Sequence, residues 1–221
     1  MKIIDLSHTI QADMPVFPGT APPMLEAAHD IARHGFSETM LHMLSHTGTH
    51  IDAPSHMLPQ GKNLDDFPIE QFFGVALIID FPHCAGTSIE FKSLQQMREK
   101  IAHAEFVLFN TGHSQKWGGK EYFADFTTLS EAAAAYLAGF PLKGVGIDAV
   151  SFDPLEQSGN PVHHILLNKG MILIENLCNL REVKGEYCMF AALPLKYGGA
   201  DGSPVRAIAI DMETKFYSDK I

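Results

Sequence analysis

Residues 44–56 read LSHTGTHIDAPSH, and eleven consecutive positions of this stretch hold three histidines and one aspartate. Side chains alternate between the two faces of an extended chain, so His46, His50 and Asp52 share one face if the segment is extended. Gly48 lies between the two histidines on that face and has no side chain to block them. Glycine, β-branched threonines and Pro54 disfavour a helix here, so we predict an extended ribbon with polar side chains on one face.

The side chains on this face predict a metal site. Two imidazoles and a carboxylate that converge on one point are typical ligands of Zn²⁺ or Mn²⁺. Pro54 ends the run and turns the chain, which can bring His56 back over the metal, either as a non-ligand or as a group of a second metal. A lone histidine on a strand is usually a structural, hydrogen-bonded residue, but this cluster is hard to explain as core packing. We therefore expect a divalent cation as cofactor, and no organic cofactor is needed.

The composition indicates an ordinary globular protein and excludes several classes. The 221 residues are 46% apolar and 19% charged, and neither a repeat nor a linker divides them, so we predict a single domain over residues 1–221. A net charge of −10 argues against nucleic acid as a partner. No apolar run approaches the roughly 18 residues that span a bilayer. The start MKIIDLSHTI is too polar for a signal peptide, and three cysteines without CxxC spacing indicate free thiols in a reducing cytoplasm.

The hydrophobic pattern predicts a mixed α/β chain of α+β-like order, because short strand-like runs outnumber helices. The predicted strands are Lys2–Leu6, Val75–Asp80, Phe106–Asn110, Val145–Ile147, Met171–Glu175, Met189–Leu193 and Val205–Asp211. Capping-box patterns at residues 87–90 and 128–131 predict two helix starts, the first before apolar residues at helical spacing from Phe91 to Ile101 and the second before the alanine-rich stretch 132–138. A third helix is predicted at Val162–Leu167.

The spacing within residues 46–56, HxGTHxDxPxH, resembles the signature of the cyclase family, which includes bacterial kynurenine formamidases and isatin hydrolases. The resemblance extends over nearly the whole chain. Its further motifs are Asp5-Leu6-Ser7-His8, Pro15-Val16-Phe17-Pro18-Gly19, Thr111-Gly112, Gly146-Ile147-Asp148 with Ser151 and Asp153, Glu175-Asn176-Leu177, and residues 201–206. The resemblance implies a swivelling β/β/α fold built on a mixed sheet with few flanking helices, and a homo-oligomer, either a dimer or a tetramer.

The same resemblance implies a metal-ligand set. His46, His50 and Asp52 look like ligands of a first metal. Asp52 would bridge to a second metal that His163 and Glu175 also hold. His163 lies twelve residues before Glu175, as the family pattern requires. One or two Zn²⁺ or Mn²⁺ ions per chain are therefore expected.

These resemblances imply a metal-dependent hydrolase that cleaves a carbon–nitrogen amide bond, an aryl formamide or a cyclic amide, in a small aromatic substrate. His56 looks like the general acid–base residue. Phe17 stands where the formamidases typically carry Trp, and it offers a flat apolar face to a substrate ring or, equally, anchors its loop against the core. The alternatives are a lyase or cyclase that uses the same metal, a lactone hydrolase, and a non-catalytic metal-bound binding protein of the same fold.

Overall fold

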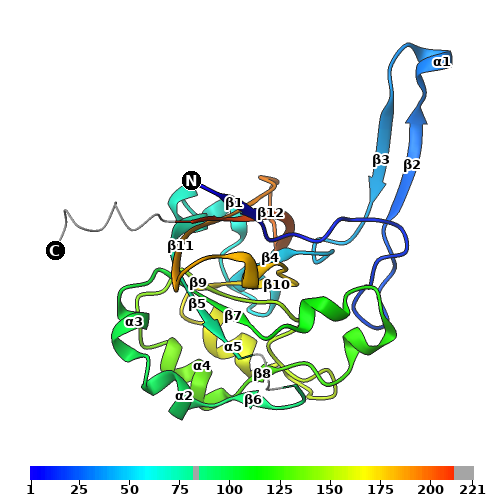
Figure 1. The fold of residues 1–221 in the computed structure, drawn as a ribbon. Helices are drawn as coiled ribbons and strands as arrows, with labels where there is room; N and C mark the ends of the chain where they lie inside the picture. The colour runs from blue at the N-terminus through cyan, green and yellow to red at the C-terminus, as the bar shows by residue number, and fades with distance from the viewer. Residues whose placement is uncertain (82–84, 212–221) are drawn as a thin grey trace.

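A mixed eight-stranded sheet forms the centre of the computed structural model, which describes residues 1–81 and 85–211 (Figure 1). The strand order is β1-β12-β11-β5-β7-β9-β10-β4, and an additional pairing of β12 with β4 closes the sheet on itself. Strands β5, β7, β9 and β10 are parallel, and the remaining pairings are antiparallel. Their bounds are β1 Ile3–Asp5, β4 His50–Asp52, β5 Phe73–Asp80, β7 Phe106–Asn110, β9 Gly144–Ile147, β10 Ile172–Glu175, β11 Tyr187–Pro194 and β12 Gly202–Asp211.

The strands are apolar on both faces because each face covers a different core. In β7, Phe106 and Leu108 point into an inner cluster enclosed by the sheet, while Val107 and Phe109 point into an outer cluster under the helices. Four helices cover the outer face, at the bottom of the molecule in Figure 1. They are α2 Phe91–Gln95, α3 Arg98–Ala102, α4 Glu131–Leu137 and α5 Pro161–Leu167. No helix of residues 1–81 and 85–211 is both long and apolar enough to cross a membrane.

The predicted mixed fold with few flanking helices is confirmed, and each predicted strand is found at its place with small shifts at the ends. Both capping-box predictions are wrong. The residues expected to open helices form a small parallel sheet, β6 Ser88–Ile89 with β8 Thr128–Leu129, in which the two hydroxyls bond to each other at 2.8 Å. Helix α4 is capped instead by Ser130, whose Oγ accepts from the amide of Ala133.

The helix predicted from Phe91 to Ile101 is two short helices, because the chain departs from helical geometry at Met97, where ψ is 16°. Short 3-10 segments also occur in several of the connections. They are η1 Pro54–His56, η2 Leu64–Asp66, η3 Ile69–Phe72, η4 His113–Lys116, η5 Lys120–Phe123 and η6 Leu180–Glu182.

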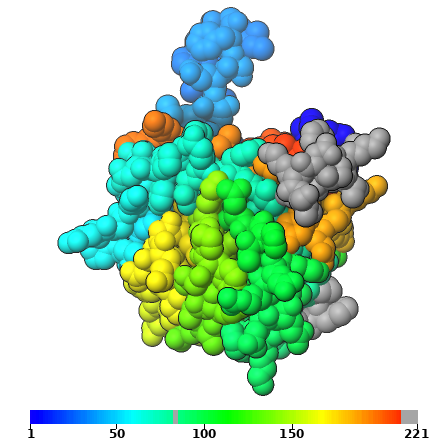
Figure 2. Space-filling model, turned by 90° about the vertical axis from the view of Figure 1, so that its left-hand side faces the viewer, coloured from blue at the N-terminus to red at the C-terminus, as the bar shows by residue number. Residues whose placement is uncertain are grey.

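A two-stranded arm, residues 24–42, stands away from the body of the molecule (Figures 1 and 2). It consists of β2 Met24–His29, the short helix α1 Ile31–His34 at the tip, and β3 Glu38–His42. None of its residues is buried. The sequence patterns did not predict the arm, because neither strand alternates between a buried and an exposed face.

Candidate metal centre

Strand β4 supplies two of the candidate metal donors, and the neighbouring strand β10 supplies a third on the same face of the sheet. Ile51 points into the inner core, so His50 and Asp52 on either side of it point to the outer face. Strand β10 runs antiparallel to β4 and places Glu175 directly opposite His50. His50 Nε2 consequently lies 3.3 Å from Asp52 Oδ1 and 3.5 Å from Glu175 Oε2.

His46 reaches the same point by a different route from the predicted one. The continuous extended ribbon is wrong: Ser45 and His46 lie in a turn, and Gly48 has a left-handed φ of 66°, a conformation that favours glycine. The turn folds the imidazole back, and its Nδ1 lies 2.7 Å from Asp52 Oδ1. Gly202 on β12 packs against this ring so closely that a Cβ there would overlap it.

Helix α5 supplies His163 from the helical layer. Asp153 receives the amide hydrogens of Val162 and His163 in the first turn, and its Oδ2 also bonds His163 Nδ1 at 2.6 Å. That bond turns the other ring nitrogen inward, and Nε2 lies 3.2 Å from Glu175 Oε1 and 3.6 Å from Asp52 Oδ2. Asp153 therefore orients His163 in the way that carboxylates orient metal-binding imidazoles.

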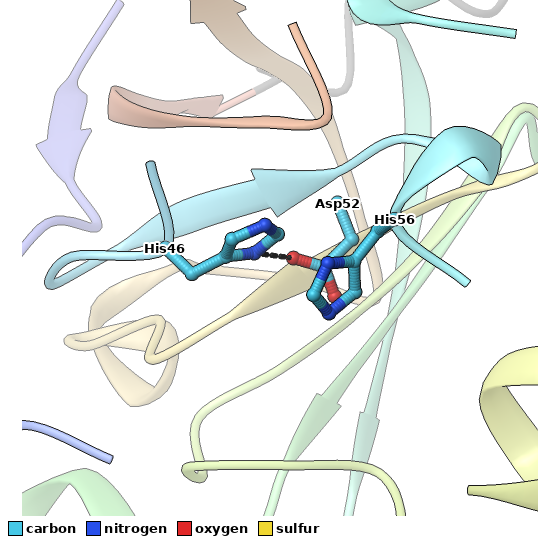
Figure 3. A group of neighbouring side chains, drawn as sticks. All are labelled: His46, Asp52 and His56. Atoms are coloured by element: carbon cyan, nitrogen blue, oxygen red, sulfur yellow. Dashed lines mark hydrogen bonds and ion pairs between the residues drawn. The ribbon is translucent and has the colours of Figure 1, made fainter. Parts of the chain in front are cut away.

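The position of His56 is set by the turn that Pro54 begins. Pro54 is the first residue of η1, and His56 is the last. In Figure 3 the His46 and His56 rings come from opposite ends of β4 and both point toward the Asp52 carboxylate. The centroids of the two rings are 3.9 Å apart, and His56 Nδ1 lies 4.0 Å from Asp201 Oδ2.

The donor set fits a divalent metal ion. His46, Asp52 and His56 form one group whose donor atoms lie within 4.8 Å of one another, and His50, Asp52 and Glu175 form another. Imidazole nitrogen with carboxylate oxygen is the ligand set of Zn²⁺ and Mn²⁺.

The burial of these groups also fits a metal. His50, Asp52, His163 and Glu175 are each at most 5% exposed, and Glu175 Oε1 makes no hydrogen bond within the described residues, although His163 Nε2 lies 3.2 Å from it. Buried ionisable groups are costly unless they are paired or coordinate a cation, so the orphaned oxygen is well placed for a metal.

The protein holds Asp52 ionised. Burial would raise the pKa of this carboxyl, but hydrogen bonds from His163, His46 and His50 keep it well below its usual range. For His46, burial would lower the pKa, but the pairing with Asp52 and Asp201 outweighs it and raises the pKa to about 9. A proton therefore competes with a metal ion for the same nitrogen.

His56 differs from the other histidines of the cluster. Burial, with further repulsion from His46 and His163, lowers the pKa of His56, although Asp52 and Asp201 oppose the shift. A histidine with a lowered pKa is neutral at pH 7 and has a free lone pair for a proton. Among these side chains, His56 is therefore the suitable proton acceptor.

A cavity of about 430 Å³ opens over the donors. His46, His50 and Glu175 form part of its wall, and Phe17 and Val150 supply apolar surface. Phe17 is 48% exposed, which fits a residue that meets a substrate at the rim better than an anchor buried in the core.

Sequence reasoning gave no role to two acids of the site. Asp201, directly before β12, lies 3.2 Å from His46 Nε2, and Asp153 orients His163. Both acids belong to motifs on which the resemblance rests. Asp201 is 155 residues from His46 in the sequence, and the two meet because β12 pairs with β4.

Comparisons with known proteins identify the family to which the chain belongs. The family model described as "Putative cyclase" matches residues 4–154. The chain is 32% identical over 213 residues to the kynurenine formamidase of Salinibacter ruber, with 96% of this chain and 98% of that protein covered. It is 31% identical over 219 residues to cyclase-like protein 2 of Oryza sativa, with 95% and 79% covered.

Two solved structures resemble the fold closely. Isatin hydrolase A from Labrenzia aggregata, bound to benzyl benzoate, superposes with a TM-score of 0.85 at 25% identity, over 96% of this chain and 94% of that one. A protein described as a potential metal-dependent hydrolase with cyclase activity superposes with a TM-score of 0.77 at 32% identity, over 96% and 98%.

Proposed function

Because the chain belongs to the cyclase family, we propose that it is a metal-dependent hydrolase that cleaves a carbon–nitrogen amide bond in a small aromatic molecule. The observation that carries the proposal is the convergence of buried imidazoles and carboxylates from β4, β10 and α5 on one point below an open cavity. Relatives named kynurenine formamidase and isatin hydrolase support the amide as the bond that is cleaved.

We assign the donors as the resemblance implies. His46, His50 and Asp52 would hold a first Zn²⁺ or Mn²⁺, and Asp52, His163 and Glu175 would hold a second. The central position of Asp52, within 3.6 Å of three imidazoles, supports a shared carboxylate. When bound, the metal would acidify a coordinated water and polarise a carbonyl group.

The residues of the chain supply the proton transfers and the binding surface. His56 is neutral at pH 7, so Nδ1 or Nε2 can accept the proton that the attacking water loses. The resulting imidazolium returns that proton to the nitrogen of the leaving amine. Ionised Asp52 stabilises the positive charge that His56 carries between the two transfers.

The cavity supports a small aromatic substrate of the aryl formamide or cyclic amide type. Its volume of about 430 Å³ suits a molecule of one or two rings, and Phe17 offers a flat face on which a ring can stack.

Activity against a panel of substrates tests the function. We expect the protein loaded with Zn²⁺ or Mn²⁺ to hydrolyse N-formylkynurenine or isatin, and EDTA to abolish turnover. Hydrolysis in ¹⁸O-water must place label in the product. Product without label would favour a lyase or cyclase, turnover of simple lactones alone would favour a lactone hydrolase, and a ligand that binds without conversion would favour a binding protein.

We also propose that the chain is a cytoplasmic homo-oligomer. Cys178 and Cys188 are free and buried, and Cys84 lies outside the described residues. An isolated two-stranded ribbon is marginally stable in water, yet the arm has no cover from its own body. Its exposed apolar side chains are Met24, Leu25, Ile31, Phe36, Met40 and Leu41.

A second copy of the chain is the partner that best fits the arm. Most oligomers are built from identical chains that bury one self-complementary patch on both subunits, and the exposed apolar side chains of the arm can form such a patch.

Sedimentation of the full chain tests this contact. We expect a dimer or tetramer at micromolar concentration, and dissociation in Leu41→Ser but not in the control Ile69→Ser, which removes an even more exposed apolar side chain from the body. A monomeric wild type would refute the homo-oligomer.

A further inference from the structure

The carboxamide of Asn176 joins the metal centre to a hydroxyl from a distant segment. Tyr122, in η5, donates its hydroxyl hydrogen to Asn176 Oδ1 at 2.5 Å, across 54 positions of sequence. The amide nitrogen of the same side chain, Nδ2, donates to the carbonyl oxygen of Gly48 at 3.0 Å. Asn176 directly follows the donor Glu175, and its left-handed φ of 56° aims the side chain back toward the turn before β4.

The chain of hydrogen bonds ends on His50. The carbonyl oxygen of Gly48 also lies 2.8 Å from His50 Nδ1, which donates its hydrogen to it. This bond fixes the tautomer of the imidazole and leaves the Nε2 lone pair facing Asp52 and Glu175. Any movement of the Gly48 peptide would rotate the ring that carries this lone pair.

Two hydrogen-bond partners, Tyr122 and the Gly48 carbonyl, hold the Asn176 amide in one orientation. The Tyr122 hydroxyl is almost fully buried, and burial together with Asp148 and Glu175 keeps the pKa of Tyr122 well above its ordinary value, so the group remains a donor. If the amide turned over, Oδ1 would face the carbonyl oxygen of Gly48, and two acceptors would oppose each other. The Gly48 carbonyl therefore sets the orientation of the amide, and the Tyr122 hydroxyl holds it there, because its hydrogen meets the acceptor Oδ1 only in that orientation.

We propose that Tyr122 is a positioning residue of the metal centre, which holds the His50 imidazole in its ligating orientation through Asn176 and the carbonyl of Gly48. The inference rests on the proposed function, because it needs His50 to bind a metal. Tyr122 also lines the cavity, and the inference gives its hydroxyl a role in metal binding that lining the cavity does not require.

A purely structural role would depend on the ring instead. The Tyr122 ring packs edge-on against Trp117 at 5.0 Å and lies 5.2 Å from His113. Phenylalanine keeps those contacts and removes only the hydroxyl. Tyr122→Phe therefore separates the two roles.

Metal affinity of the purified protein is the decisive measurement. We expect Tyr122→Phe to weaken Zn²⁺ binding about tenfold or more in competition with a chromophoric chelator, the usual loss when a group that orients a ligand is removed. Tyr136→Phe is the matched control, because its hydroxyl is also buried but has no hydrogen-bond partner among residues 1–81 and 85–211, and we expect wild-type affinity from it.

A second pair of variants tests the route through Asn176. Asn176→Gly removes the amide without strain at the left-handed φ, and we expect Tyr122→Phe to add no further loss in that background. Additive losses of Zn²⁺ affinity in the double variant would refute the positioning role. So would Tyr122→Phe protein with unchanged affinity and a Tm that is lowered equally in its chelator-treated and metal-loaded forms. A wild type that binds no Zn²⁺ or Mn²⁺ would instead refute the proposed function, so the two failures are distinguishable.

Discussion

Replacing Gly202 by alanine would place a methyl group against the imidazole of His46. The added Cβ would overlap Cε1 of the ring and lie 2.6 Å from Nε2 and 2.9 Å from Nδ1. Ordinary contacts begin near 3.5 Å, so the ring must retreat by about 1 Å. That movement would stretch both of its ion pairs, to Asp52 at 2.7 Å and to Asp201 at 3.2 Å.

A displacement of this size matters to a metal ligand. Ligand distances in metal sites hold to about 0.2 Å, so we expect Gly202→Ala to weaken Zn²⁺ binding at least about tenfold and to lower kcat/KM with it. Gly198→Ala, in the loop that precedes β12, is the control, because its added Cβ would meet no atom of the described residues within 4 Å. Chelator competition measures the affinity, and circular dichroism checks the fold. Wild-type affinity in a folded Gly202→Ala protein would show that His46 binds no metal.

Three further predictions concern the histidines. His56→Ala should keep its metal and lose roughly 10²–10⁴ in rate, the usual share of acid–base catalysis; normal turnover would exclude His56 from proton transfer. His50→Ala should lose metal before it loses its fold, and elemental analysis that finds equal metal in both proteins would contradict the ligand role. The pKa of His46 is raised to about 9, so metal binding at pH 7 must release the proton of this imidazole. The metal affinity should therefore rise with pH toward 9, and the activity should fall below about pH 6. Calorimetry in two buffers of different ionisation enthalpy would detect the proton, and equal heats would contradict its release.

The strands of the sheet could be predicted from the sequence, whereas the arrangement of the candidate metal donors could not. Buried strands such as Phe106–Asn110 are continuous apolar runs, and such runs are visible without a structure. The capping-box patterns failed because Ser88 and Thr128 found partners in each other across a small sheet, and tertiary pairing overrides a local preference.

The candidate site, too, could be predicted only in part. Residues 46–56 predicted a cluster of donors, yet the parity argument holds only for His50 and Asp52, because Gly48 turns the chain before the strand begins. The positions of Asp201 and Tyr122 depend on strand pairing and on packing between segments 54 to 155 residues apart. No local pattern in the sequence carries that information.

The pairing of β4 affects when the site can form during synthesis. This three-residue strand is hydrogen-bonded on one side to β10 and on the other to β12, both of which follow it by more than a hundred residues. A ribosome that has released only the first 160 residues has made His46, His50, Asp52 and His56 but neither strand that holds β4 in place. The nascent protein would therefore acquire its metal only after the last strand has left the exit tunnel.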